Sequence, residues 1–499
     1  MPSISEVEQF MDFLAQACQL VRSFPLAYNQ LHALVGYDEI YTQTDSELES
    51  NWKSNDLQGF FAFLQDKVTS ITNSIDQSRY VEAQTICEWM DSKISYIPTA
   101  KEGMFSIAAA VHISKNQVVQ VGTLNPNYKQ AGIQIYPKFS VADAYEIDDT
   151  GERARSLASR DSMFGLNSDL DNVLVVPLQQ GLSVCNIIFP YENIIDAEDN
   201  CIKIAFLPLT ADEDILLYKK TTVTWDGITM QGVEPYGLRD PEPTVALNRF
   251  SESWKESCRQ GADIVFAPEM LGTYMTESTE LEGAYNALVK NLSLEMLLVE
   301  HKRSPSITIM PSYWHDGVNC VTIVDSEGAI LGHQNKNTPF INKRLHEMEA
   351  LKQPSETCFL IIHIPGVHRI VVMVCAEFLA SYDRSSKEKI CAEFGATLFI
   401  VPSYTHGEQD FINTLPSLKC YGATVIWGNS CSAAKAPRVI GGCSIAGTDV
   451  ISRFSDACQC NFICNEKVLA CGFLITLPVH LIRVKPIPPT VPSIQHFLC

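Results

Sequence analysis

The 499-residue sequence has no apolar run that approaches the roughly 18–20 residues needed to cross a bilayer, so we expect no membrane-spanning segment. Its first residues, Met1 to Glu6, also lack the basic stretch and apolar core of a secretory signal. Hydrophobic residues make up 46% of the chain and charged residues 19%, which is typical of a globular protein and not of a disordered one. We therefore expect a cytoplasmic protein, and the chain length predicts two or more domains.

Positive charge is scarce in this sequence. The chain has 37 Lys and Arg against 58 Asp and Glu, and its formal net charge is −21. A nucleic-acid backbone needs a basic surface, so we expect no direct nucleic-acid binding. The imbalance is concentrated in residues 1–200, which hold 12 of the Lys and Arg but 27 of the Asp and Glu. This acidic N-terminal half could bind a basic protein partner, although a solvated acidic surface is the more common interpretation.

The 17 cysteines are scattered through apolar segments, which indicates reduced and mostly buried thiols. The one dense cluster has the spacing C-x-C-x3-C-x6-C, and zinc sites more typically use paired C-x2-C motifs. The alternation also fits strand residues around a turn. We expect no metal and no organic cofactor, although the sequence alone leaves open whether this cluster binds a metal. Its members are Cys458, Cys460, Cys464 and Cys471.

The first 200 residues show two successive patterns. Residues 1–97 are predicted to be helical, because apolar residues recur at helical spacing near the N-terminus, near 56–76 and through 81–94. Residues 98–197 change to short strand-like runs and predict an α+β module of unknown function. An acidic stretch interrupts the pattern and places a domain boundary near 190–200.

Beyond that boundary, strand-like and helical patterns alternate over residues 200–485, which predicts helices packed on sheets. Three reactive side chains follow strand-like apolar runs in this region. A thiol, a carboxylate and an ammonium are what acyl transfer through a thioester requires: the thiol attacks, the carboxylate moves protons and the ammonium stabilises the oxyanion. Single motifs of this kind are common by chance, but three in order at domain-sized separations are not. The three residues are Glu269, Lys336 and Cys375.

The same region resembles the nitrilase family of carbon–nitrogen hydrolases over roughly residues 200–480. Gly261 to Glu269 is similar to the first catalytic segment of that family, Gly332 to Lys336 to its lysine segment, and Arg369 to Glu377 to its strand and nucleophile elbow. The resemblance implies an α/β fold, a four-layer αββα nitrilase-like sandwich, preceded here by a separate α+β N-terminal module. It also implies a homo-oligomer.

The resemblance also implies roles for these residues. Glu269 would be the general base, Lys336 the stabiliser of the oxyanion, and Cys375 the nucleophile. The backbone amide of Ala376 would supply a second oxyanion donor, and Glu377 would support the site.

Families of this type often use a further glutamate between the lysine and the cysteine. Glu347 and Glu349 are both candidates, and we favour Glu349. Four aromatic or imidazole side chains could line the pocket, although isolated aromatic residues more often have packing roles. They are Tyr274, Tyr313, Tyr404 and His406.

Two departures from the family pattern leave the exact reaction open. About 35 residues separate the first strand of the region from its helix, more than the usual short connection. The common Arg-Ala-Arg segment of the family is replaced around Ser417 to Ala423.

We expect hydrolysis of a non-peptide amide, carbamoyl or nitrile group in a small-molecule substrate. An amide or acyl transferase with the same triad, and a catalytically diverged effector, sensor or scaffold in a signalling or defence complex, are the alternatives. The sequence does not identify the substrate.

Overall fold

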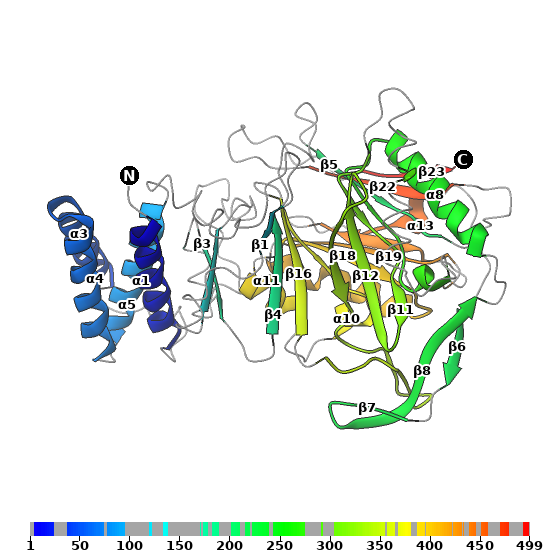
Figure 1. Ribbon diagram of the computed structural model, residues 1–499, viewed down its shortest axis with the longest axis horizontal. Coiled ribbons are helices and arrows are strands. Elements are labelled where there is room, and N and C mark those ends of the chain that lie inside the picture. The colour runs from blue at the N-terminus through cyan, green and yellow to red at the C-terminus, as the bar shows by residue number, and fades with distance from the viewer. Residues whose placement is uncertain are drawn as a thin grey trace. The chain divides into compact units, whose positions relative to one another are not determined.

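In the computed structural model the chain divides into two compact units (Figure 1). Unit 1 comprises Met1–Ile188 and Lys389–Gly395, and unit 2 comprises Phe189–Glu388 and Ala396–Cys499. The separation of residues 1–97 from 98–197 stays a prediction. The structure describes residues 4–23, 37–73, 77–94, 119–121, 133–137, 170, 173–177, 182–188, 201–209, 215–219, 222–238, 243–274, 291–292, 304–354, 357–364, 368–380, 387–394, 396–421, 423–431, 433, 439–445, 451–457, 470–478 and 493–498.

The described helices of unit 1 surround an apolar core. Phe60 and Trp89 lie at its centre with ring centroids 5.2 Å apart. Helix α3 lies within the segment predicted to be helical, although its buried positions include only scattered residues such as Thr44 and Leu48 and form no apolar stripe. The helices are α1 (Ile4–Ser23), α3 (Tyr37–Ser54), α4 (Leu57–Thr72) and α5 (Gln77–Ile94).

Two antiparallel strand pairs follow in unit 1. Strand β1 (Val119–Val121) pairs with β4 (Leu182–Ile188), and β2 (Ile133–Pro137) pairs with β3 (Val173–Pro177). Helix α11 (Lys387–Phe394) belongs to unit 1 from Lys389 onward. Unit 1 therefore contains both helices and strands, as expected for an α+β module.

Unit 2 contains two large sheets, and each has parallel strands at its centre. In the first sheet β17, β18 and β19 are parallel, and in the second β5, β9 and β10 are parallel. The order in the first sheet is β16 (Thr357–Ile364), β17 (His368–Val372), β18 (Leu398–Ser403), β19 (Thr424–Asn429), β20 (Gly441–Ser444) and β21 (Ile451–Arg453). The order in the second is β11 (Tyr313–His315), β12 (Val318–Asp325), β10 (Ile307–Ile309), β9 (Ile264–Phe266), β5 (Cys201–Phe206), β22 (Cys471–Pro478) and β23 (Ser493–Leu498), with β13 (Ile330–Asn335) paired to β12.

The two sheets pack face to face through aromatic side chains. Phe206 of β5 stacks near Phe266 and Phe454, with ring centroids 4.8 and 5.8 Å away. It also lies directly against Gly428 of the opposite sheet, where an added Cβ would come within 2.3 Å of the Phe206 ring. The glycine is thus required by the close approach of the two sheets.

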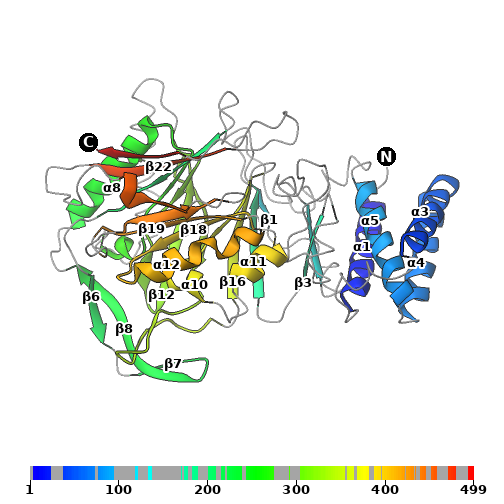
Figure 2. The ribbon, with the colours of Figure 1, turned by 180° about the vertical axis from the view of Figure 1, so that it is seen from behind.

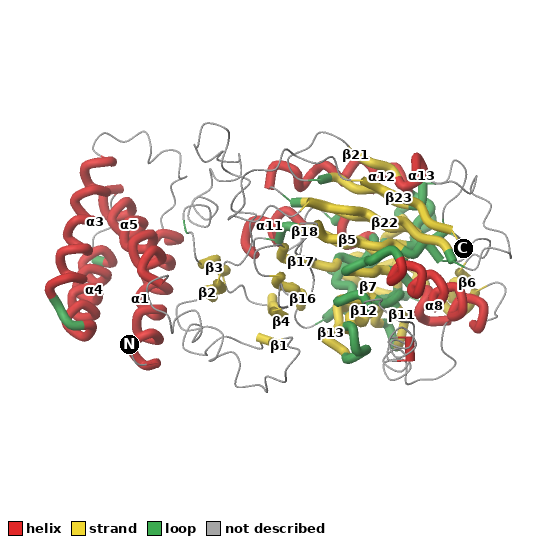
Figure 3. The backbone as a smooth tube through the Cα atoms, turned by 90° about the horizontal axis from the view of Figure 1, so that it is seen from above, coloured by secondary structure: helices red, strands yellow, loops and turns green. Residues whose placement is uncertain are grey.

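Helices cover the two outer faces. Trp254 of α8 (Pro243–Arg259) is buried in an apolar cluster with residues of the second sheet, such as Val265. Phe411 of α12 (Glu408–Thr414) stacks on Trp427 of the first sheet, with centroids 4.9 Å apart. Figure 3 shows α8 and α12 on opposite sides of the strands, and Figure 2 shows α12 from behind. The predicted four-layer αββα sandwich is therefore confirmed. The short helices of unit 2 are η5 (Leu271–Tyr274), α10 (Ala376–Leu379), η6 (Leu415–Tyr421) and α13 (Phe454–Ala457).

A third, smaller sheet combines three strands of the long connection between β5 and α8 with two short strands from residues 341–349. The sequence predicted no elements in that connection. Figure 1 shows its longest strand, β8, as a ribbon at the lower edge of unit 2. The missed signal is Asp226-Gly227, whose φ values of 45° and 78° are those of a tight hairpin turn between β7 and β8. The strands are β6 (Ile215–Lys219), β7 (Val223–Trp225), β8 (Ile228–Leu238), β14 (Ile341–Asn342) and β15 (Glu347–Glu349).

None of the helices in the described ranges is both long and apolar enough to cross a membrane.

The contact between the sheets generates a stability prediction. Gly428→Ala should lower the unfolding free energy by about 1–3 kcal/mol, because the new methyl group must displace Phe206. Gly407→Ala is the matched control: its nearest neighbour would be 3.5 Å away and its φ is −98°, so a change within about 0.5 kcal/mol is expected. Thermal unfolding of both variants measures the difference. Equal melting of Gly428→Ala and the parent would contradict the described packing.

Candidate active site

The three predicted reactive residues meet in the interior of unit 2. Glu269 lies three residues after β9, Lys336 directly follows β13, and Cys375 lies three residues after β17. Their exposed fractions are 1%, 4% and 4%. Charged groups are rarely this buried without partners, so their contacts decide what the site can do.

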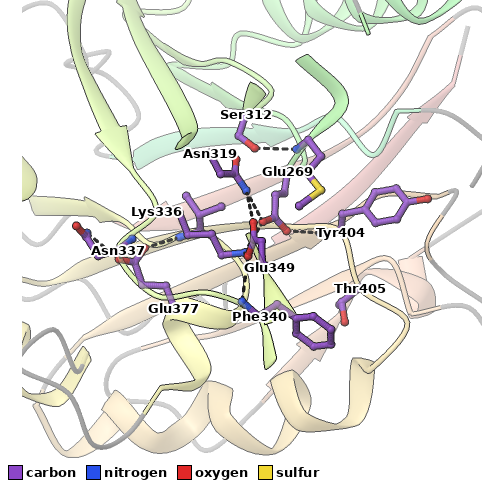
Figure 4. Close-up of polar contacts among 12 residues, drawn as sticks. Glu269, Ser312, Asn319, Lys336, Asn337, Phe340, Glu349, Glu377, Tyr404 and Thr405 are labelled. Carbon is purple, nitrogen blue, oxygen red and sulfur yellow. Dashed lines mark hydrogen bonds and ion pairs between the residues drawn. The ribbon is translucent and has the colours of Figure 1, made fainter. Parts of the chain in front are cut away.

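Lys336 is held between two carboxylates (Figure 4). Its Nζ lies 2.7 Å from Oε1 of Glu269 and 2.7 Å from Oε2 of Glu349. Asn319 Nδ2 donates to both carboxylates, at 2.8 Å to Glu269 Oε1 and 3.2 Å to Glu349 Oε1. We call these four residues the ion cluster: Glu269, Asn319, Lys336 and Glu349.

Burial and mutual attraction set the charges of the ion cluster. Burial alone would lower the pKa of Lys336, but the charges of Glu269 and Glu349 outweigh it and raise that pKa well above its ordinary value. Burial raises the pKa of Glu269, and the charge of Lys336 opposes this rise only in part. Lys336 is thus a permanent cation, whereas Glu269 takes up a proton more readily than an exposed glutamate.

The second oxygen of Glu269 faces the nucleophile segment. Glu269 Oε2 accepts a hydrogen bond from the backbone N–H of Tyr404, at 3.1 Å. The thiol of Cys375 interacts electrostatically with the same carboxylate. Burial and the negative charge of Glu269 raise the pKa of Cys375, and Lys336 lowers it only partly. The Cys375 thiol is therefore protonated before substrate binds, and Glu269 is the carboxylate that can accept its proton.

Cys375 occupies a sharp turn between β17 and α10. Its φ of 50° and ψ of −113° lie in a region that residues with a Cβ rarely adopt. The backbone N–H of Cys375 donates to the carbonyl of Pro402 at 2.9 Å, which helps to hold this conformation. Such strain is found where a side chain must be presented to a ligand.

Glu377 joins the cysteine segment to the lysine segment. Its Oε2 accepts from the backbone N–H of Val374 at 3.0 Å, and its Oε1 accepts from the N–H of Asn337 at 3.1 Å and from Asn337 Nδ2 at 2.8 Å. The side chain is fully buried, and burial raises the pKa of Glu377 to about 7, although these donors oppose the rise. Glu377 thus fixes the spacing between the neighbours of Lys336 and Cys375.

The other predicted site residues have different surroundings. Of the two candidate glutamates, Glu349 belongs to the ion cluster, whereas the partly exposed Glu347 pairs with Asn342 in the β14–β15 ladder. Ala376 begins α10 directly after the nucleophile and is half-buried. That its amide stabilises an oxyanion stays a prediction.

Of the four predicted pocket residues, Tyr313 and Tyr404 pack against the same apolar cluster, and the rings of Tyr404 and His406 lie 6.2 Å apart. Tyr404 approaches Glu269 through its backbone N–H, and its side chain is half-buried. Tyr313 packs against the apolar cluster beneath α8. His406 is exposed, with Nδ1 2.6 Å from the carbonyl of Ala433. The side chain of Tyr274 lies outside the described residues.

Asn319 was missed by the sequence analysis. It is a fully buried amide in strand β12, which also contains the buried polar residue Thr322, so no local pattern singled it out. Ser312 was missed as well: its Oγ accepts from the backbone N–H of Met270 at 2.7 Å and so fixes the turn that follows Glu269.

Among the described residues, no group of three or more His, Cys, Asp or Glu side chains is arranged to hold a metal ion. Three members of the predicted cysteine cluster, Cys458, Cys460 and Cys464, lie outside these residues. The fourth, Cys471, has its Sγ 3.3 Å from His496 Nε2.

No protein-family model and no curated protein matches the chain. Solved structures similar to its C-terminal part include an amidase from Nesterenkonia sp., with 12% identity and a TM-score of 0.34 over 61% of this chain and 92% of that one. A glutamate-to-glutamine mutant of the amidase from Nesterenkonia sp. AN1, showing Michael addition of acrylamide at its active-site cysteine, has 14% identity and a TM-score of 0.34, over 48% of this chain and 84% of that one. A cysteine-to-serine mutant of the AN1 amidase, described as from the nitrilase superfamily, has 14% identity and a TM-score of 0.32, over 46% and 77%. No family membership follows from likeness at this level.

The buried Glu377 predicts a pH-dependent contribution to stability. Its pKa in the folded protein, about 7, exceeds the ordinary value of 4.5, so the folded state binds this proton more tightly than the unfolded chain. The resulting stabilisation is fully present below about pH 4.5 and is lost as the pH rises through about 7. The unfolding midpoint of the wild type should therefore fall between pH 5 and pH 8.5 by more than that of Glu377→Gln, which cannot titrate. Urea unfolding at both pH values measures this, with the exposed Glu327→Gln as control. Parallel pH curves for the wild type and Glu377→Gln would contradict the assignment.

Proposed function

We propose that unit 2 is a cysteine-dependent hydrolase of non-peptide carbon–nitrogen bonds, acting on an amide, carbamoyl or nitrile group. The observation that carries this proposal is the electrostatic interaction of a buried, strained cysteine thiol with a carboxylate that is itself paired with a buried ammonium. The residues are Cys375, Glu269 and Lys336. A structural ion pair alone would need no strained cysteine at the end of a strand.

For an amide, the first half of the reaction forms a thioester. Cys375 Sγ attacks the carbonyl carbon while Glu269 takes the thiol proton. Lys336 stabilises the oxyanion, together with the backbone N–H of Ala376. The carbon–nitrogen bond then breaks, and the leaving amine takes the proton that Glu269 holds.

The second half regenerates the enzyme with water. A water molecule attacks the thioester carbon while Glu269 takes one of its protons. The carbon–sulfur bond breaks, the acid leaves, and the proton returns from Glu269 to the Cys375 thiolate. The raised pKa of Glu269 suits a group that must accept and return a proton twice in each turnover.

Glu349 gives the lysine its second partner in this scheme. With two carboxylates in contact, Lys336 stays protonated and acts as a fixed positive charge rather than as a nucleophile or a base. A transferase would use the same thioester with an amine in place of water. The acceptor therefore distinguishes the two reactions, whereas the triad does not.

Kinetics of cysteine and glutamate variants test the proposal. Cys375→Ala and Glu269→Gln should each lower kcat for ammonia release from short amides by about a thousandfold or more, because each removes a group that no neighbour replaces. Cys443→Ala removes another buried thiol, on β20, and should keep wild-type activity. Lys336 is a poor choice for this test, because its loss would leave two buried carboxylates unpaired and unfold the site.

Circular dichroism and thermal unfolding establish that the variants are folded before their rates are compared. Ammonia release by Cys375→Ala at the wild-type rate would exclude a thioester at this residue. Transfer of the acyl group to an added primary amine at low concentration, in preference to water, would favour the transferase.

A further inference from the structure

The segment between Lys336 and Glu349 forms a hairpin that rises directly from the ion cluster. We call residues 340–349 the rim hairpin. At its base the N–H of Phe340 donates to Glu349 Oε2 at 3.0 Å, and the N–H of Glu349 donates to the carbonyl of Phe340 at 2.9 Å. Figure 4 shows Phe340 beside Glu349 and Lys336. The base of the rim hairpin therefore adjoins the ion cluster.

The hairpin is anchored to unit 2 along one strand. Strand β15 pairs in parallel with β8, and Met348, at the centre of β15, is only 1% exposed. Met348 packs in an apolar cluster with Trp225 and Trp314. Strand β15 is thus held in place by β8, and the turn, residues 343–346, lies beyond this pairing.

The turn combines exposed cations with an exposed apolar side chain. Lys343, Arg344 and His346 are exposed, and Leu345 is 58% exposed. Two contacts order the turn: the N–H of Leu345 donates to Asn342 Oδ1 at 3.1 Å, and the N–H of Gln231 donates to the carbonyl of His346 at 3.1 Å. These two hydrogen bonds fix the conformation of the turn.

The hairpin also holds a disproportionate share of exposed apolar surface. Four large hydrophobic side chains are exposed in the described part of the chain, and two of them, Phe340 at 48% and Leu345 at 58%, lie on the rim hairpin. Phe340 is at its base and Leu345 is at its turn. An apolar substrate chain that runs from the ion cluster to the turn would cover both.

Charge in the ion cluster and on the turn has opposite sign. Inside the cluster one ammonium faces two carboxylates, so a substrate anion would be repelled there. On the turn, neither Lys343 nor Arg344 forms an ion pair with a described residue. An anionic group on the substrate is therefore favoured at the turn and disfavoured near Cys375.

We propose that the rim hairpin is a substrate-recognition element for amides whose far end carries a carboxylate, joined to the amide by an apolar chain. The inference rests on the proposed function of the Cys375 site. The carboxylate would bind Lys343 and Arg344, and the chain would cover Phe340. Glu349 lies three positions after His346 along the chain, a span of about 10 Å for extended backbone. The monoamide of octanedioic acid has a carboxylate at a comparable distance from its amide carbon.

Binding to the full-length Cys375→Ala protein tests this inference without turnover. Calorimetry compares three probes of equal chain length: the monoamide of octanedioic acid, octanamide and 8-aminooctanamide. We expect the monoamide to bind about three- to tenfold more tightly than octanamide, the range for one or two exposed ion pairs, and 8-aminooctanamide to bind most weakly. The preference should shrink as the salt concentration rises.

Two charge-reversal variants, built on the same protein, locate the effect. Lys343→Glu with Arg344→Glu should abolish or invert the preference for the monoamide. The matched control is Lys53→Glu with Arg453→Glu, which makes the same change in net charge at two exposed residues outside the hairpin and should keep the preference. Equal binding of monoamide and octanamide, no measurable binding of any probe, or a preference that survives reversal at 343 and 344 would overturn the inference.

Ammonia release by the wild-type protein separates this inference from the proposed function. If the monoamide is preferred in binding but no probe releases ammonia, the hairpin inference stands and the hydrolase proposal fails. If probes are hydrolysed with no difference in kcat/KM between the anionic and neutral ends, the hydrolase proposal stands and the hairpin inference fails.

Discussion

The buried contact of Lys336 with Glu269 and Glu349 is the interaction on which unit 2 depends. Moving such ions out of water costs several kcal/mol each, and only close pairing and additional hydrogen bonds offset that cost. Asn319 supplies those bonds to both carboxylates. The three charged side chains come from β15 and from the segments after β9 and β13, so the charges can pair only when these elements are packed. Fold and site are thus formed together.

Further contacts extend this pairing to the nucleophile. Glu269 interacts with the thiol of Cys375 and accepts a hydrogen bond from the backbone N–H of Tyr404. Glu377 joins the segments that follow β13 and β17 through its own hydrogen bonds. A thiol whose pKa is raised is a poor nucleophile until its proton is removed, and the carboxylate that can remove it is already in contact. Reactivity is therefore confined to the moment when a bound substrate lets proton transfer and attack occur together.

The sequence predicted the part of this arrangement that follows from local pattern. Glu269, Lys336 and Cys375 each come after an apolar strand, and strand ends bring such residues together in an α/β sheet. Asn319 could be found only through its pairing with two distant carboxylates, since nothing local requires it. Strands β6 to β8 were missed because they depend on a tight turn at Asp226. Tertiary contacts decide these elements, and one sequence does not show them.

The central claim is that Cys375, whose proton Glu269 accepts, forms a thioester with the substrate. Acid quenching of the wild-type protein during turnover of a short amide, followed by intact mass measurement and peptide mapping, tests it most directly. The account predicts a mass increase equal to the amide minus ammonia, located on the peptide that contains Cys375 and lost upon treatment with hydroxylamine. Turnover with no adduct under any quench time, or an adduct on a different cysteine, would contradict it.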